Sequence, residues 1–260
     1  MIPTGRITGL ILLVVLCAII IANIYRAKRG KGPQLRKLAA IDAIEEVIGR
    51  AVETGRPVHV CTGEIASLYK GETDQVIAGI SVLAYTARLT ARLGAKLVVT
   101  QSEPDVYLVE RELVREMYIA EGRGDSFNDD MVIPLLGGPR SMKAGLLGVV
   151  ERLRPAANIS IGPWYSTTVY MMEAFHGVGA MQITGTARIS QIPFIAAASD
   201  YFTIGEEVYC VGAYLSDDPS QKGAIVGIDY GKILFITLIL IGLISVIFNA
   251  NVWLINLLKT

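Results

Sequence analysis

Two long uncharged apolar runs, one near each end of the chain, constrain the fold more than any other feature. They occupy residues 7–25 and 233–258. A helix rises about 1.5 Å per residue, so roughly 20 apolar residues cross the ~30 Å hydrocarbon core of a bilayer. We therefore expect one transmembrane helix at each end. A cleaved signal peptide is the alternative for the first run, but its apolar length and the basic residues that follow favour an uncleaved anchor.

Basic residues predict how the two spans are oriented. Arg6 precedes the first run, whereas six Lys and Arg side chains follow it within residues 26–37, which we take as a basic juxtamembrane linker. Cytoplasmic loops of membrane proteins are enriched in Lys and Arg. The predicted arrangement is an integral protein of the cell membrane with two spans. Its central domain is expected to be cytoplasmic, both termini outside, and the lipid bilayer a partner.

Composition excludes several classes of protein. The 260 residues include 24 basic and 24 acidic side chains, and the resulting net charge of zero removes the electrostatic basis for nucleic-acid binding. A hydrophobic content of 52% argues against disorder. Cys17, Cys61 and Cys210 lie far apart and form no C-x-x-C pair, so the sequence predicts neither a disulfide scaffold nor a zinc site.

The residues between the apolar runs, 38–229, predict one α/β domain. Helical periodicity is clear in residues 34–54, and short apolar strands alternate with helices through the rest of the domain. The expected strands are residues 58–61, 96–100, 131–136, 158–161, 181–184, 194–198 and 202–204. Apolar strands separated by helices predict an open, mostly parallel sheet with helices on both faces, a Rossmann-like three-layer sandwich.

Polar residues after the predicted strands form the candidate ligand site. In open parallel sheets, ligands bind beyond the carboxyl ends of the strands, where hydroxyls and backbone N–H groups can hold them. The candidates are Thr62, Gly63, Glu64, Ser102, Ser166, Thr184, Thr186 and Glu206. Short polar turns and helix caps need the same residue types, so a purely structural role is the alternative.

No catalytic or cofactor motif is complete. Gly177 and Gly179 lack the third glycine of a dinucleotide-binding loop, and they precede a strand instead of following one. His59 and His176 fit structural positions better than a catalytic triad. The acidic loop 125–130 lacks the glycine and the glutamate of a calcium site. We therefore predict no metal and no cofactor, and the sequence assigns no reaction.

Several segments resemble a known family. They are AIDAIEE at residues 40–46, QITGT at 182–186, SQIPF at 190–194, IGEE at 204–207 and AYLS at 213–216. These segments are similar to prokaryotic (archaeal and bacterial) membrane-anchored proteins built around a domain of unknown function. The similarity covers nearly the whole chain, although residues 61–64 do not match the family pattern. Because the family has no established activity, the resemblance supports the architecture and implies no chemistry.

Three functions remain open. Two anchors hold one domain against the cytoplasmic face, which restricts its orientation and favours lateral association, so we first expect a homo-oligomeric scaffold or assembly protein. The alternatives are a small-ligand-binding or sensory module at the strand ends and a membrane-surface enzyme of unknown reaction, of which the enzyme is less expected. Two spans without charged residues offer no ion path, which disfavours a transporter.

Overall fold

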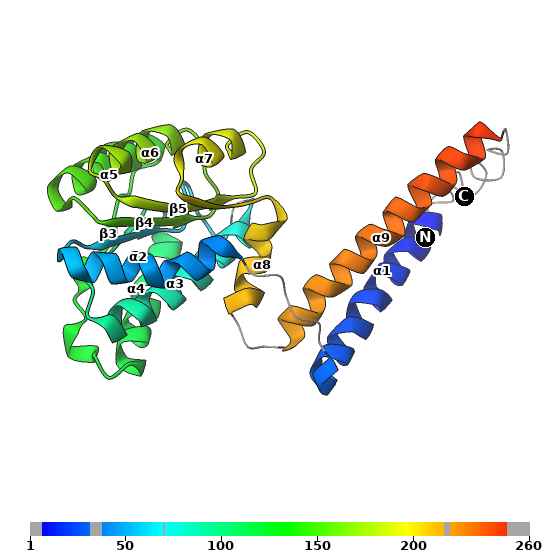
Figure 1. The fold of residues 1–260 in the computed structure, drawn as a ribbon, viewed down its shortest axis with the longest axis horizontal. Helices are drawn as coiled ribbons and strands as arrows, with labels where there is room; N and C mark the ends of the chain where they lie inside the picture. The colour runs from blue at the N-terminus through cyan, green and yellow to red at the C-terminus, as the bar shows by residue number, and fades with distance from the viewer. Residues whose placement is uncertain (1–6, 32–37, 70, 216–218, 249–260) are drawn as a thin grey trace. The chain divides into compact units, whose positions relative to one another are not determined.

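The protein consists of two compact units (Figure 1). The computed structural model describes residues 7–31, 38–69, 71–215 and 219–248. One unit combines the two terminal segments, and the other is Lys37–Leu215. The predicted domain, residues 38–229, extends beyond this second unit because residues 219–229 form the start of the last helix. Part of the second apolar run, residues 249–258, lies outside the described residues.

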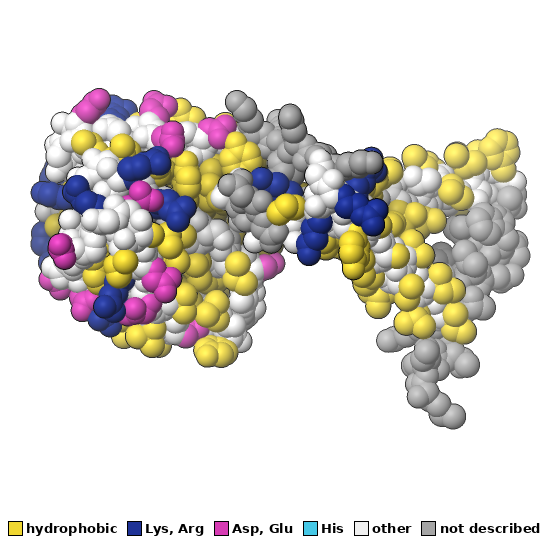
Figure 2. All heavy atoms as spheres, turned by 90° about the horizontal axis from the view of Figure 1, so that it is seen from below, with side chains coloured by type: hydrophobic (Ala, Val, Ile, Leu, Met, Phe, Trp, Pro, Cys, Tyr) yellow, Lys and Arg dark blue, Asp and Glu magenta, His cyan; other side chains and the backbone are white. Residues whose placement is uncertain are grey.

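The terminal unit is a pair of apolar helices. The helix α1 (Ile7–Arg26) continues into the short segment η1 (Ala27–Lys31), and its partner is α9 (Pro219–Ile247). The stretch Ile7–Gly30 and α9 are each long and apolar enough to cross a membrane. Hydrophobic side chains cover the described surface of this pair in Figure 2, and Val14 and Ile239 are 60% and 69% exposed. Side chains this apolar and this exposed suit a lipid environment.

Glycines allow α9 to approach α1 closely. Gly223 and Gly227 are four residues apart and therefore lie on one helix face. A β-carbon at Gly223 would lie 2.8 Å from the backbone oxygen of Asn23, and one at Gly227 would lie 2.7 Å from the Cα atom of Ile20. Small residues at this spacing let membrane helices pack backbone against backbone.

The second unit is built on a six-stranded, all-parallel sheet, which confirms the predicted α/β class. The strand order is β3-β2-β1-β4-β5-β6. The strands are β1 (Val58–Cys61), β2 (Leu97–Gln101), β3 (Val132–Pro134), β4 (Ala157–Ile161), β5 (Met181–Thr186) and β6 (Tyr201–Ile204). The order changes direction between β1 and β4, and this topological switch point is where open α/β sheets bind ligands.

Helices cover both faces of the sheet. In Figure 1, α2, α3 and α4 lie below the sheet and α5, α6 and α7 lie above it. Their bounds are α2 (Ala39–Thr54), α3 (Thr73–Leu93), α4 (Pro104–Ala120), α5 (Pro139–Leu153), α6 (Thr168–Gly177) and α7 (Ile192–Ala198); α8 (Glu206–Leu215) and the short turns η2 (Gly124–Ser126) and η3 (Asp129–Met131) complete the unit. The helix α3 is also long and apolar enough for a span, but 56% of its apolar window is buried in this unit.

One predicted strand is wrong. Residues 194–198 form most of α7 and not a strand. Pro193 stands in the first turn, where its fixed φ angle suits a helix, and the alanines that follow are good helix formers. Parallel neighbours such as β5 and β6 need a crossover connection, and α7 provides it. The segment is almost entirely apolar, which is typical of a buried strand. In the structure it is a short helix in which only Ile195 is fully buried.

Candidate functional site

The loops after β1 and β4 meet backbone to backbone at the switch point. Gly63 has a φ angle of 127°, and a β-carbon there would lie 2.6 Å from the Cδ atom of Pro163. A β-carbon at Gly162 would overlap the backbone oxygen of Thr62. The Glu64 N–H donates to the Pro163 oxygen at 2.7 Å. Glycine is required for this approach, so the predicted candidate Gly63 has a backbone role.

Glu64 is a fully buried carboxylate at the start of α6. Its Oε2 accepts the N–H groups of Tyr165 at 3.0 Å and Thr167 at 2.8 Å, and its Oε1 accepts the Ser166 hydroxyl at 3.1 Å. The first N–H groups of a helix lack partners inside it and attract negative charge. Tyr165 and Thr167 lie just before α6, so Glu64 holds the loop that leads into this helix and its charge faces the helix N-terminus.

A second buried carboxyl lies beneath the loop that follows β1. The Thr62 hydroxyl donates to Oε1 of Glu110 at 2.5 Å, and the Gln101 amide donates to the same oxygen at 3.0 Å. Oε2 of Glu110 has no hydrogen-bond partner in the described parts of the chain. Burial raises the pKa of Glu110 to about 7, although the bonds from Thr62 and Gln101 act in the opposite direction. This carboxyl therefore changes its charge near neutral pH.

The loop that connects β1 to α3, residues 62–72, has an unusual backbone. Ile65 and Glu72 have φ angles of 55° and 69°, a left-handed conformation that costs energy for residues other than glycine. The Ser102 hydroxyl accepts the Ile65 N–H at 3.2 Å, and Asp105 accepts the Leu68 N–H at 2.8 Å. Strained residues of this kind cluster at ligand clamps and switch regions.

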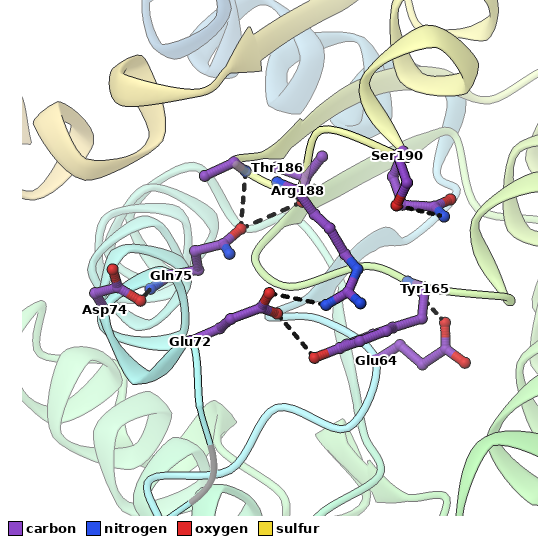
Figure 3. Close-up of polar contacts among 10 residues, drawn as sticks. Glu64, Glu72, Asp74, Gln75, Tyr165, Thr186, Arg188 and Ser190 are labelled. Atoms are coloured by element: carbon purple, nitrogen blue, oxygen red, sulfur yellow. Dashed lines mark hydrogen bonds and ion pairs between the residues drawn. The ribbon is translucent and has the colours of Figure 1, made fainter.

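Three charged or aromatic side chains from different loops meet above this region (Figure 3). Arg188 Nη1 lies 2.8 Å from Oε1 of Glu72, and the Tyr165 hydroxyl donates to Oε2 of Glu72 at 2.8 Å. The guanidinium carbon of Arg188 lies 3.8 Å from the centre of the Tyr165 ring. Burial, and then the Glu72 carboxylate, raise the pKa of Tyr165, so its hydroxyl keeps its proton. The Arg188 and Glu72 side chains are 36% and 28% exposed, so solvent reaches both.

The end of β5 positions Arg188. Gln75 in the first turn of α3 accepts the Thr186 hydroxyl at 3.2 Å and the Ala187 N–H at 2.8 Å. The Arg188 N–H donates to the Thr186 hydroxyl at 3.3 Å. The backbone at Arg188 is thereby tied to both the sheet and α3. We call Glu64, Glu72, Tyr165, Thr186 and Arg188 the switch-point rim.

The structure brings most of the predicted candidates together, but not all. The residues that meet at the loops after β1, β2, β4 and β5 are Thr62, Gly63, Glu64, Ser102, Ser166 and Thr186. The Thr184 hydroxyl instead pairs with Ser199 at the end of α7. Glu206 is exposed in the first turn of α8, after the edge strand β6. Neither Thr184 nor Glu206 is part of the switch-point rim.

Sequence reasoning missed Glu72, Arg188 and Glu110. Two signals were present: Arg188 is the first charged residue after β5, and Glu110 lies four residues from both Val106 and Val114 on the buried face of α4. A carboxylate within an apolar helical stripe indicates burial. Glu72 lies in the loop after β1. No sequence pattern around it indicates that its side chain contacts residues that follow β4 and β5.

A separate polar network crosses the middle of the sheet. His59 Nδ1 lies 2.9 Å from the Asn158 side-chain oxygen, and His59 Nε2 lies 2.9 Å from the Thr100 hydroxyl. The Ser160 hydroxyl donates to the same Asn158 oxygen at 2.6 Å. Since that oxygen is an acceptor, we place the His59 proton on Nδ1. Burial lowers the pKa of His59 to about 4, so the ring is neutral, and all four residues are fully buried.

Neither a metal centre nor a deep converging pocket competes with the rim among the described residues. Within the described residues, no group of three or more His, Cys, Asp or Glu side chains is arranged to hold a metal ion. A groove of about 500 Å³ runs between α6 and α7. Its lining is partly apolar, with Met172 and Phe194, and partly polar, with Glu173, His176 and Asp200. The groove lacks the convergence of three loops that distinguishes the switch-point rim.

Comparison with known proteins gives one match. A family model described as "Domain of unknown function (DUF6754)" matches residues 1–257. No curated protein matches the chain, and no solved structure matches it. The predicted resemblance to a family built around a domain of unknown function is confirmed, and the match includes both apolar helices.

Proposed function

The chain belongs to the DUF6754 family, and we propose that it is a membrane-anchored module that binds a small polar ligand at the switch-point rim. The observation that carries this proposal is the meeting of Glu72, Tyr165 and Arg188 from three loops at the carboxyl edge of the sheet. The switch point of an open parallel sheet is the usual place for a ligand. A sensory role would use the two helices as the anchor.

The rim contacts are suited to exchange with a ligand. The ion pair between Arg188 and Glu72 is partly exposed, and such pairs contribute only about 0–1 kcal/mol to stability. The strained Ile65 and Glu72 lie in the same connection. A ligand that replaces the ion pair therefore displaces a weak interaction.

The proposed orientation follows from the basic linker. Six Lys and Arg side chains in residues 26–37 favour a cytoplasmic position for the α/β unit of a prokaryotic membrane protein, with both termini outside. Cysteine-reactive labels that do not cross membranes provide a test. Cysteines introduced at Lys143 or Arg152 should stay unlabelled in intact cells, and labelling there would reverse the proposed orientation.

Ligand screening of the full chain in nanodiscs tests the binding function. A panel of polar metabolites is added, and the melting temperature is recorded for each. We expect one class to raise it saturably, because a ligand that binds only the folded state stabilises it. Hydrogen exchange should then show protection in residues 62–72, 162–167 and 186–191. Protection confined to the groove between α6 and α7, or no stabilising metabolite, would contradict the proposal.

A homo-oligomeric scaffold is the second candidate. Apolar side chains on and near α6 and α7 are exposed, with Val169 at 48%, Phe194 at 47% and Ile189 at 83%. Exposed apolar groups that gather on neighbouring elements favour association. The mass of the nanodisc-embedded protein by light scattering tests this candidate. A discrete oligomer that Phe194→Ser dissociates would support it, and a monomer would exclude it.

A further inference from the structure

The rim already holds one anion, which is the carboxylate of Glu72. Its two oxygens take a guanidinium and a phenol as donors, with both distances at 2.8 Å. Arg and Tyr donors aimed at the two oxygens of one carboxylate make the arrangement by which proteins bind free carboxylates and phosphates. The Arg188 guanidinium also stacks on the Tyr165 ring, a contact that does not involve Glu72 and that favours the same guanidinium position.

The two partners of the ion pair differ in what else holds their side chains. The Arg188 guanidinium also stacks on the Tyr165 ring, and the Arg188 N–H donates to the Thr186 hydroxyl. Glu72 is the N-cap residue of α3, and its carbonyl accepts the Gln75 N–H at 3.0 Å, so its backbone is held by the helix. When the pair opens, we therefore expect the Glu72 side chain to rotate away and Arg188 to remain on the ring.

We propose that the switch-point rim is a site for a small anion that carries a carboxylate or phosphate group, and that Glu72 occupies this site as an internal competitor. The inference rests on the proposed ligand-binding function and names its ligand class. Arg188 and Tyr165 are the binding residues. The incoming anion takes both donors, and the Glu72 side chain turns towards solvent.

Charge explains why an internal competitor is useful at this position. Without Glu72, Arg188 would lie on the aromatic ring with no counter-charge from the rim, since Glu64 is bound to the N–H groups of Tyr165 and Thr167. Glu72 keeps the site neutral until a ligand arrives. The apparent affinity is reduced by the fraction of molecules in which the competitor is bound. The rim therefore responds only to ligand concentrations high enough to displace Glu72.

Opposite effects of two substitutions test the inference. Inorganic phosphate and malonate serve as probes, and their dissociation constants are measured by calorimetry with the full chain in phosphatidylcholine nanodiscs. Glu72→Gln should tighten binding about tenfold if the pair is closed nine-tenths of the time. Arg188→Gln should weaken it at least ~10-fold, and Tyr165→Phe should weaken it about 3-fold.

A matched control comes from a second ion pair on the same unit. Arg111 and Asp129 pair at 2.8 Å on the surface, and neither belongs to the rim. Arg111→Gln and Asp129→Asn should leave both dissociation constants unchanged. Thermal melting of every variant shows whether it is folded, and Arg188→Lys retains the charge in case Arg188→Gln does not fold. In that case, Arg188→Lys should weaken binding because the planar guanidinium fork is lost.

The result that would overturn the inference is binding that Arg188→Gln leaves unchanged, or that Glu72→Gln weakens. Weaker binding of phosphate or malonate to Glu72→Gln would show that Glu72 supports the site and does not compete for it. If a metabolite from the screen protects the rim but binds equally well to Arg188→Gln, the anion inference fails while the binding function stands. If nothing binds at the rim, both fail.

Lipid headgroups are a second source of the same phosphate chemistry. The titration is therefore repeated in nanodiscs that contain phosphatidylglycerol. Phosphate binding that falls in these discs supports a headgroup as the anion. Phosphate binding that is unaffected by the lipid supports a soluble anion. Binding in either disc that does not depend on Arg188 contradicts the inference.

Discussion

The two polar networks of the α/β unit join neighbouring strands but differ in burial and charge. The network in the middle of the sheet links His59, Thr100 and Asn158, which are fully buried, and its histidine is neutral. The switch-point rim links Glu72, Tyr165 and Arg188, which are charged or polar and partly exposed. Loss of a buried polar partner is costly, whereas an exposed ion pair can be exchanged at little cost. We conclude that the first network stabilises the sheet and that the second is available to a ligand.

The largest expected effect is at the contact that supports both networks. Gly162→Ala places a β-carbon against the Thr62 backbone, so β1 and β4 must separate beyond their ends. We expect a loss of more than about 4 kcal/mol in the free energy of unfolding, or no folded unit at all. Chemical denaturation measures it. Gly148→Ala is the control, since its β-carbon would meet nothing within 4 Å, and it should be neutral or stabilising.

Glu110, which lies beneath the switch-point rim and outside both networks, should give the unit a pH-dependent stability. The folded state keeps the Glu110 proton up to a pKa of about 7, whereas the ordinary pKa of a glutamate is 4.5, so stability falls as the pH rises between these values. Glu110→Gln should reduce the stability difference between pH 5 and pH 8 by roughly 3 kcal/mol. Denaturation curves at both pH values test this expectation. An unchanged difference would show that Glu110 does not hold its proton near neutral pH.

The titration of His59 has the opposite effect, because it makes the free energy of unfolding rise with increasing pH. Its pKa falls from 6.5 to about 4 in the folded protein, so the unfolded state binds more protons between these values. Stability from this group is complete above pH 6.5 and is lost as the pH falls towards 4. In the Glu110→Gln variant, the rise of stability between pH 4 and 6.5 should therefore become visible. Its absence would contradict a neutral, buried His59.

The hydrogen-bond network in the middle of the sheet should be disrupted when the Asn158 side chain is truncated. Asn158→Ala leaves the His59 ring N–H and the Ser160 hydroxyl without their shared acceptor in a buried place. We expect a loss of about 2 kcal/mol in the free energy of unfolding. Asn128→Ala, which removes an exposed turn bond, is the control and should cost less than about 1 kcal/mol. Equal losses would remove the distinction between buried and exposed polar groups.

The smallest expected effect on stability is at the rim. Arg188→Gln breaks a partly exposed ion pair, so the free energy of unfolding should fall by less than about 1 kcal/mol. The same variant should lose anion binding. Guanidinium denaturation at constant pH measures the stability change. A loss of several kcal/mol would mean that the rim is structural, like the middle of the sheet.

The fold was predictable because burial patterns are local in sequence. Continuous apolar strands such as β1 and the amphipathic face of α2 indicate an α/β sandwich directly. The strand order was not predictable. The sequence does not show whether each crossover connection places the next strand on one side of β1 or on the other. The four-residue spacing of Gly223, Gly227 and Gly231 was a readable signal for the close helix pair, and the prediction did not use it.

The candidate site was predictable only in part. Glu64 and Thr186 were predicted as candidate site residues because the residues at and after strand ends can be located from the strand pattern alone. The contact between Glu72 and Arg188 joins residues 116 positions apart and depends on the path of the loop 62–72. No periodicity encodes that path. The pairing of Glu72 with Arg188 is therefore visible only in the structure, although both charged residues can be seen in the sequence.

Hydrogen exchange of the full chain in nanodiscs, with and without inorganic phosphate, tests the central claim most directly. We predict that the amides of Leu68 and Ala187 exchange at least ~100-fold faster than those of β1 and β4 in the free protein. Phosphate should slow exchange at the rim and leave the middle of the sheet unchanged. Rim amides as protected as the sheet, or phosphate with no effect on the rim, would contradict an exchangeable ligand site at the switch point.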